Sequence, residues 1–130
     1  MKVELSVDNN YLNLCKVNVI VNRNGKKKID REWEKVERFI ANSNFAGKNN
    51  LIVSLSIDDK TIFQQTKVKH KAECYQSVFH MLESFLMDKL HFYHKLTPEE
   101  RTSELDAEYR RNRQSLQLLK KVDRKMRRLM

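Results

Sequence analysis

The sequence predicts an α+β fold in which two units, each a β-hairpin plus a helix, form a four-stranded antiparallel sheet with helices on one face. A long amphipathic, basic C-terminal helix follows. Two observations predict the sheet and its helices: apolar residues alternate with polar ones in three short segments, and recur every three or four positions in longer segments. A period of two indicates half-buried strands, and spacings of three and four indicate amphipathic helices. A third observation, the crowding of positive charge near the C-terminus, predicts the basic helix.

Residues 2–7 and 14–22 form the first predicted hairpin. Asp8, Asn9 and Asn10 between them supply side chains that are typical of turns. The residues expected to face inward are Val3, Leu5, Val7, Cys15, Val17, Val19 and Val21. The two strands are therefore expected to pair antiparallel, with one face against the core.

The first helix is expected to begin near Asp30, which is a favourable N-cap residue. A basic loop at residues 26–28 precedes it, and Glu32 and Glu34 follow in the first turn, where the helix dipole favours acids. Its apolar face comprises Trp33, Val36, Phe39 and Ile40. Asparagine and serine at 42–44 predict its end.

The second hairpin-plus-helix unit repeats this order. Leu51, Val53, Leu55 and Ile57 alternate through a strand, a tight turn is expected at 58–60, and 61–69 returns as the fourth strand. A helix is then predicted from about Lys71 to Lys95. Its apolar residues are Tyr75, Val78, Phe79, Leu82, Phe85, Leu86, Leu90 and Tyr93. Because every spacing among them is one, three or four, this is the strongest helical pattern in the chain.

The last helix is expected to start at Thr97 as N-cap. Pro98 suits the first helical position, and Glu100 completes a capping box. Neither glycine nor proline follows, so one helix could run to Met130, about 50 Å at 1.5 Å per residue. The chain is therefore divided into an α+β domain, 1–96, and a C-terminal helix, 97–130.

A heptad-like seam of mostly apolar residues runs along this last helix. Its members are Leu105, Tyr109, Asn112, Leu116, Leu119 and Met126. A single polar member such as Asn112 can fix the register of a helix pair. The seam could pack on its own domain, pair with a second copy of the chain or dock on another protein, and we expect self-association.

Positive charge is concentrated beside this seam. The last 22 residues hold nine bases and one acid, Asp123, a net charge of +8 out of +9 for the whole chain. The nine bases are Arg110, Arg111, Arg113, Lys120, Lys121, Arg124, Lys125, Arg127 and Arg128. A near-neutral body with a concentrated basic end is typical of a protein that binds a polyanion.

The leading functional hypothesis is non-catalytic binding of nucleic acid through phosphate contacts. Neither a zinc finger nor an aromatic-rich strand motif that reads bases is present, which favours contacts to the backbone and shape of the nucleic acid over sequence readout. We expect RNA or a ribonucleoprotein rather than a specific DNA site. Lys26, Lys27 and Lys28 could extend the basic surface, as could the lysines at 67, 69 and 71. The alternative hypothesis is a structural or adaptor protein, such as one from a virus or mobile element, whose seam and bases dock on an acidic protein.

The sequence offers little enzymatic chemistry. Two glycines cannot build a glycine-rich phosphate loop, and Cys15 and Cys74 stand apart rather than in a metal-binding pair. Asp88, His91 and His94 are close in sequence but poorly spaced for a shared metal, so a metal-dependent hydrolase is the least favoured class. We expect no enzyme activity, metal or cofactor. The absence of a signal peptide or a long apolar run predicts a cytoplasmic protein without a membrane partner.

Overall fold

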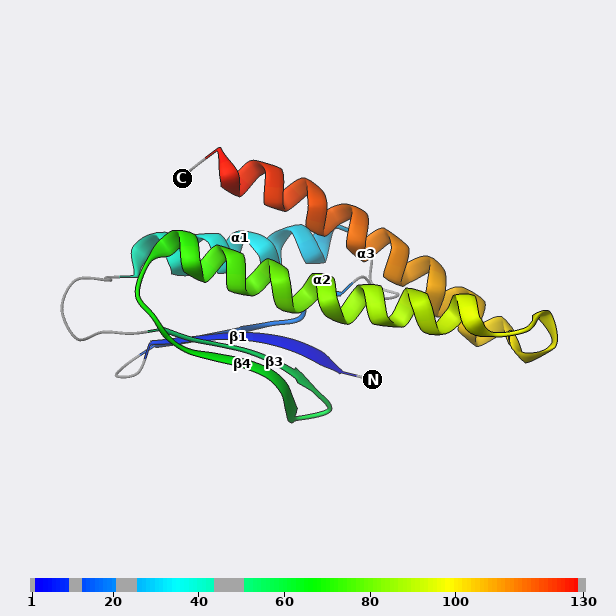
Figure 1. Ribbon diagram of the computed structural model, residues 1–130. Helices are drawn as coiled ribbons and strands as arrows, with labels where there is room; N and C mark the ends of the chain where they lie inside the picture. The colour runs from blue at the N-terminus through cyan, green and yellow to red at the C-terminus, as the bar shows by residue number, and fades with distance from the viewer. Residues whose placement is uncertain (1, 10–12, 21–25, 44–50, 129–130) are drawn as a thin grey trace.

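The computed structural model describes residues 2–9, 13–20, 26–43 and 51–128. The predicted α+β fold is confirmed (Figure 1). In chain order the elements are β1 (Val3–Asn9), β2 (Asn13–Val17), α1 (Lys26–Asn42), β3 (Leu51–Ile57), β4 (Lys60–Val68), α2 (Lys71–Lys95), a 3₁₀ turn (Pro98–Glu100) and α3 (Ser103–Arg127).

The four strands form one antiparallel sheet in the order β2-β1-β3-β4. Leu5 of β1 lies opposite Val17 on one side and Leu55 on the other, so three apolar side chains meet in one row. Helices α1 and α2 cover a single face of the sheet, as predicted (Figure 1). The opposite face carries alternate residues such as Ser6 and Ser54, which are polar and partly exposed.

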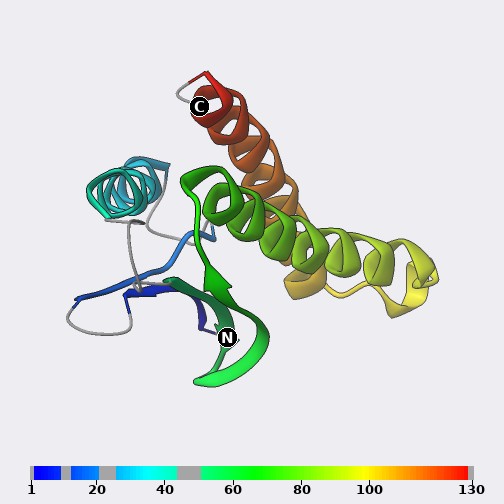
Figure 2. The same ribbon diagram turned by 60° about the vertical axis from the view of Figure 1, so that its left-hand side comes forward.

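Helix α3 adds a third layer. It packs along α2, on the side of α2 that faces away from the sheet (Figure 2). The end of α2 and the start of α3 extend beyond the sheet as a helical hairpin (Figure 1). One hydrophobic core joins the layers, with fully buried members from every helix: Val36, Ile40, Leu82, Leu86 and Met126.

The turn between β3 and β4 lies where the sequence predicts it. Asp58 and Asp59 adopt φ angles of 49° and 68°, the left-handed region that a two-residue hairpin turn of the primed type requires. Aspartate tolerates this region better than most residues because its short side chain bonds to nearby backbone. A third residue with positive φ, Lys67, lies where the register between β3 and β4 shifts, so the edge strand β4 is irregular.

Three predicted boundaries in the first half of the chain need correction. Strand β1 continues to Asn9, so Asp8 and Asn9 belong to the strand and not to the turn. Helix α1 begins at Lys26, so residues 26–28 form its first turn and not a loop. Lysine has a helix propensity close to that of leucine, and the three lysines extend the helix before Asp30. Strand β2 ends at Val17; Val19 is buried but lies beyond the strand, and Val21 lies outside the described residues.

The predicted start of the C-terminal helix is also wrong. Glu100 does accept a hydrogen bond from the backbone N–H of Thr97, at 2.9 Å, as a capping box requires. It closes only the 3₁₀ turn, because Arg101 adopts an extended conformation with ψ at 103°. The true N-cap is Thr102, whose hydroxyl oxygen accepts from the N–H of Leu105 at 3.2 Å. Thr97 and Thr102, five residues apart, are both suited to cap a helix, and Thr102 is the one that caps α3.

Candidate nucleic-acid interface

The seam of α3 is packed against its own chain. The buried residues of this helix are Asn112, Ser115, Leu119, Val122 and Met126, spaced by three and four. Leu119, Val122 and Met126 belong to the same core as the sheet. Leu105, Tyr109 and Leu116 are half-buried. Of the three possibilities left open by the sequence, the structure shows packing on the chain's own domain, so self-association through the buried seam would require α3 to leave α2.

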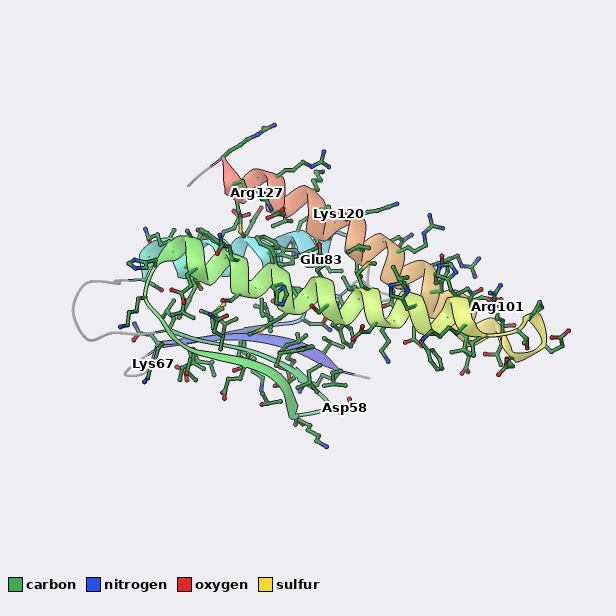
Figure 3. The ribbon with its side chains drawn as sticks, viewed as in Figure 1. Asp58, Lys67, Glu83, Arg101, Lys120 and Arg127 are labelled. Atoms are coloured by element: carbon green, nitrogen blue, oxygen red, sulfur yellow. The ribbon has the colours of Figure 1, made fainter. Side chains whose placement is uncertain are left out.

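Because the seam side of α3 packs against the rest of the chain, the basic residues on the other sides of the helix face outward. Eight of the nine bases are exposed, and Arg111 is half-buried. Lys120, for example, lies on the side of α3 that faces away from the sheet (Figure 3). From Arg110 to Arg128 the bases extend over about 27 Å at 1.5 Å per residue. We call these nine residues the basic ridge.

Two members of the basic ridge form ion pairs with carboxylates of the same chain. Lys125 Nζ lies 3.5 Å from Glu37 Oε2 on α1, and Arg127 Nε lies 3.1 Å from Asp123 Oδ2. Both cations remain largely exposed, at 62% and 71%, so these are weak surface pairs. Within the part of the chain that the structure describes, the other seven bases form no ion pair. Most of the positive charge is therefore available to a ligand.

The structure describes only one of the other two lysine clusters. The side chains of Lys26, Lys27 and Lys28 lie outside the described residues. Lys67 lies on β4, on the opposite side of the molecule from Lys120 (Figure 3). Lys71 donates from Nζ to the carbonyl oxygen of Ala41 at 2.9 Å, which ties the start of α2 to the end of α1.

A groove of about 610 Å³ separates α1 from α3. Its lining residues are Asp30, Trp33, Glu34, Glu37, Leu118, Lys121, Val122, Arg124, Lys125 and Arg128. The α1 side therefore carries three carboxylates, the α3 side carries four bases of the ridge, and three apolar residues lie between them. The sequence places Trp33 on an apolar helix face, but it does not reveal that α3 lies opposite.

Trp33 is the unusual member of this α1–α3 groove. The residue is only 3% exposed and stacks on Phe79, with ring centroids 5.8 Å apart. Its indole Nε1 is buried and has no hydrogen-bond acceptor among the described residues. Buried polar groups in folded proteins are nearly always hydrogen-bonded, so this donor is an exception.

A second groove, of about 440 Å³, lies between α2 and α3. His80, Glu83 and Asp123 contribute to its lining, together with Tyr75 and Arg127. Even so, among the described residues no group of three or more His, Cys, Asp or Glu side chains is placed so that it could hold a metal ion.

The histidines of the α2 sequence DKLHFYH lie close to the helical hairpin. His94 Nε2 is 3.1 Å from the hydroxyl of Tyr109. The ring of Tyr109 stacks on that of Tyr93, with the ring centroids 4.0 Å apart. The hydroxyl of Tyr93 donates to Asp106, and this bond is the main reason that the pKa of Tyr93 is raised. The guanidinium of Arg101 lies over the same ring, 4.7 Å from its centroid. These contacts join α2 to α3 and give His94 a structural role.

Neither cysteine is suited to nucleophilic chemistry. Burial raises the pKa of Cys74 to about 12, and burial is also the main cause of a raised pKa at Cys15. The thiolate is the reactive form of cysteine, and both thiols are protonated at neutral pH.

Comparisons of the chain with protein-family models, with curated proteins and with solved structures found no match. Among the helices that the structure describes, none combines the length and the apolar composition needed to cross a lipid bilayer.

Proposed function

We propose that this protein binds nucleic acid without catalysis, with RNA or a ribonucleoprotein as the favoured ligand, and acts as an accessory or assembly component. The observation that carries the proposal is the basic ridge. It combines eight bases on one helix, and a ninth at its C-cap, with a second, apolar side of the same helix that is fixed to α2. A ligand can therefore be met by a preorganised row of charges, and little ordering is needed on binding.

The length of the ridge suits a polymer of phosphates. A double helix carries about one negative charge per 1.7 Å of its axis, so a ridge of about 27 Å can face many phosphates. Such contacts position a protein along a nucleic acid without reading its sequence. Among the described residues, the open face of the sheet offers Ser6, Ser54 and Gln64 and not the stacked aromatics of sheets that bind RNA bases, so the ridge is the better candidate.

A second function has one specific observation in its favour. The pair between Lys125 and Glu37 shows a base of the ridge in contact with a carboxylate on a protein surface. An acidic protein could present similar carboxylates to the other bases. The chain would then be a structural or adaptor protein, and the ridge would be its docking surface.

The salt dependence of binding tests the first function. Binding of a fluorescent 20-nucleotide RNA would be followed by anisotropy at increasing salt, for the native chain and for a variant with Arg110→Gln, Arg113→Gln, Lys120→Gln and Arg124→Gln. If all four bases contact phosphates, the slope of log K against log salt should decrease by about 3 to 4, at 0.7–0.9 per contact. The fold should be retained, because these four side chains are exposed.

A matched control removes the same charge elsewhere. Lys60, Lys67 and Lys69 near β4, with Lys95 at the end of α2, are exposed and lie outside the ridge. Their joint replacement by glutamine should leave the salt slope nearly unchanged. Equal losses in the two variants would reject the ridge as the binding surface. Tight binding to polyglutamate with none to RNA would support the adaptor function in its place.

A further inference from the structure

The helical hairpin formed by the end of α2 and the start of α3 carries an exposed aromatic side chain beside a pocket. Phe92 on α2 is 58% exposed, although phenylalanine is among the residues that are most often buried. A pocket of about 170 Å³ lies next to this ring, between the two helices. Phe92 and Tyr93 line it from α2, and Leu105, Tyr109 and Asn112 line it from α3. We call it the hairpin pocket.

The hairpin pocket is large enough to hold one aromatic ring. An apolar cavity of about 150 Å³ binds benzene, and the hairpin pocket is slightly larger. One of its walls is preformed, because the rings of Tyr93 and Tyr109 stack on each other with centroids 4.0 Å apart. Aromatic rings prefer stacked or edge-to-face contacts, so this pair suits a further ring as its neighbour. Phe92 is itself part of the wall and cannot fill the pocket of its own chain.

Two charged residues complete the lining of the hairpin pocket, Lys89 from α2 and Glu108 from α3. Both are half-buried, and neither forms an ion pair within the part of the chain that the structure describes. A partner that covers the pocket is complementary in charge if it brings a carboxylate to Lys89 and an ammonium group to Glu108. Together with a ring for the pocket, these are the three groups that the hairpin surface itself offers. The surface is therefore complementary to a second copy of itself.

We propose that two copies of this chain form a symmetric dimer in which Phe92 of each copy enters the hairpin pocket of the other. In a twofold contact the same patch meets itself, so a residue that contacts another in the second copy is matched by the reverse contact. A twofold axis that passes between Lys89 and Glu108 pairs Lys89 of each copy with Glu108 of the other. The contact then has aromatic residues at its centre, where interface energies are largest, and an ion pair on either side.

The position of the hairpin suits such a dimer. The hairpin extends beyond the sheet, so a second copy can reach it without meeting the sheet (Figure 1). Among the described residues that line the hairpin pocket, none is a base of the basic ridge, so the dimer leaves both ridges open to a ligand. The hairpin is narrow, and contacts of small area belong to the weak, transient class of interfaces. The dimer goes beyond the proposed function and does not rest on it.

Sedimentation of the full chain over a range of concentrations tests the dimer. Between about 1 µM and about 1 mM, the interval of weak association, the native mass should rise from that of one chain to that of two. Phe92→Ala should raise the dissociation constant at least about thirtyfold, because a central aromatic side chain is lost from both copies. Leu14→Ala is the matched control: Leu14 is 59% exposed on β2, outside the hairpin, and its loss should leave the constant unchanged.

Exchanging the charges tests the reciprocal pairing. Lys89→Glu places two carboxylates at each ion pair, and Glu108→Lys places two ammonium groups there, so each variant alone should stay monomeric over the same range. An equal mixture of the two variants should dimerise about as strongly as the native chain, because every pair then joins opposite charges. Within each variant the two residues still have like charges, so recovery in the mixture can come only from contact between chains. Denaturation in urea shows whether each variant is folded, and Phe92→Ala remains as the test if one is not.

Each failure has a distinct meaning. A native chain that stays monomeric at every concentration would overturn the dimer and leave the hairpin pocket to a different partner or to none. A dimer that Phe92→Ala does not weaken, or that Leu14→Ala weakens equally, would reject the hairpin as the contact. A mixture of folded charge variants that stays monomeric would reject the twofold pairing. Growth of the native chain beyond two copies would do so too, because a twofold contact closes at two. None of these results bears on nucleic-acid binding, which the salt dependence tests separately.

Discussion

Helices α2 and α3 are both 25 residues long and pack against each other, yet they carry very different side chains. Helix α2 has eight buried residues, and its three lysines are balanced by three acids. Helix α3 has five buried residues and carries eight bases against four acids. The difference follows from position, because α2 lies between the sheet and α3, whereas α3 adjoins another layer on one side only (Figure 2).

In this protein the excess positive charge is carried by the outer helix, α3, and not by α2, which is covered on two sides. A helix that is covered on two sides has little surface left on which charged groups can stay hydrated, and burying a charge is costly. An outer helix needs only a narrow apolar side to hold it. Helix α3 can therefore present the basic ridge without a cost to the core, and the ridge should be separable from stability by mutation.

The largest expected effect comes from truncating the buried side of each helix. Leu82→Ala in α2 and Leu119→Ala in α3 should each lower the free energy of unfolding by about 2–5 kcal/mol, because both side chains are buried and a cavity remains. Denaturation in urea measures the change. Met87→Ala, at a position that is 38% exposed on α2, is the control and should change stability by no more than about 0.5 kcal/mol.

The shape of the same unfolding curves tests whether α3 is part of one cooperative unit. Because Leu119 lies in the common core, Leu119→Ala should shift a single transition that α2 and α3 share. Two separate transitions, with only the weaker one shifted, would indicate that 1–96 and 97–130 unfold independently.

A smaller effect is expected at the start of α3. Thr102→Ala removes the hydroxyl that accepts from the N–H of Leu105 and should cost about 1 kcal/mol. Thr97→Ala is the matched control. The bond from the backbone N–H of Thr97 to Glu100 survives this change, and the 3₁₀ turn that Thr97 caps ends before α3 begins, so this variant should cost less than Thr102→Ala. Equal losses would show that both threonines act as helix caps.

The smallest expected effect is a pH dependence in the 3₁₀ turn. The hydrogen bond from the backbone N–H of Thr97, which favours the ionised carboxylate, lowers the pKa of Glu100 below its ordinary value of 4.5. The stability from this bond is therefore fully present above the ordinary pKa and is lost as the pH falls through the lowered one. NMR titration of the Glu100 carboxyl carbon and of the Thr97 amide should give one shared midpoint below 4.5. A midpoint at or above that value would contradict the capping geometry.

The bounds of α2 were predictable closely, because its apolar spacing of three and four is regular over its whole length. The starts of α1 and α3 were not. At the start of α1, the three lysines that were predicted to form a loop are the first turn of the helix. At the start of α3, two threonines are both suited to be the N-cap, and only Thr102 caps the helix. Local rules identify residues that can begin a helix, but they do not rank two candidates that lie a few positions apart.

In the candidate site, too, some residues could be predicted from the sequence and others could not. The nine bases of the ridge could be named from the sequence, since charge is a property of composition. Trp33 and Glu34 could not be connected with them, because about 90 residues separate these side chains from Arg124 along the chain and no periodicity relates positions so far apart. Only packing brings α1 opposite α3 and opens the groove between them.

The amino-acid sequence by itself determined the kinds of element and the faces that each must bury, because these follow from repeats of two and of three to four residues. Tertiary structure alone decided which apolar surface covers the seam of α3: it is α2 of the same chain, and the side opposite is left to the bases. The physical reason is that hydrophobic attraction is non-directional. An apolar stripe specifies that it will be covered, and the geometry of the whole fold selects what covers it.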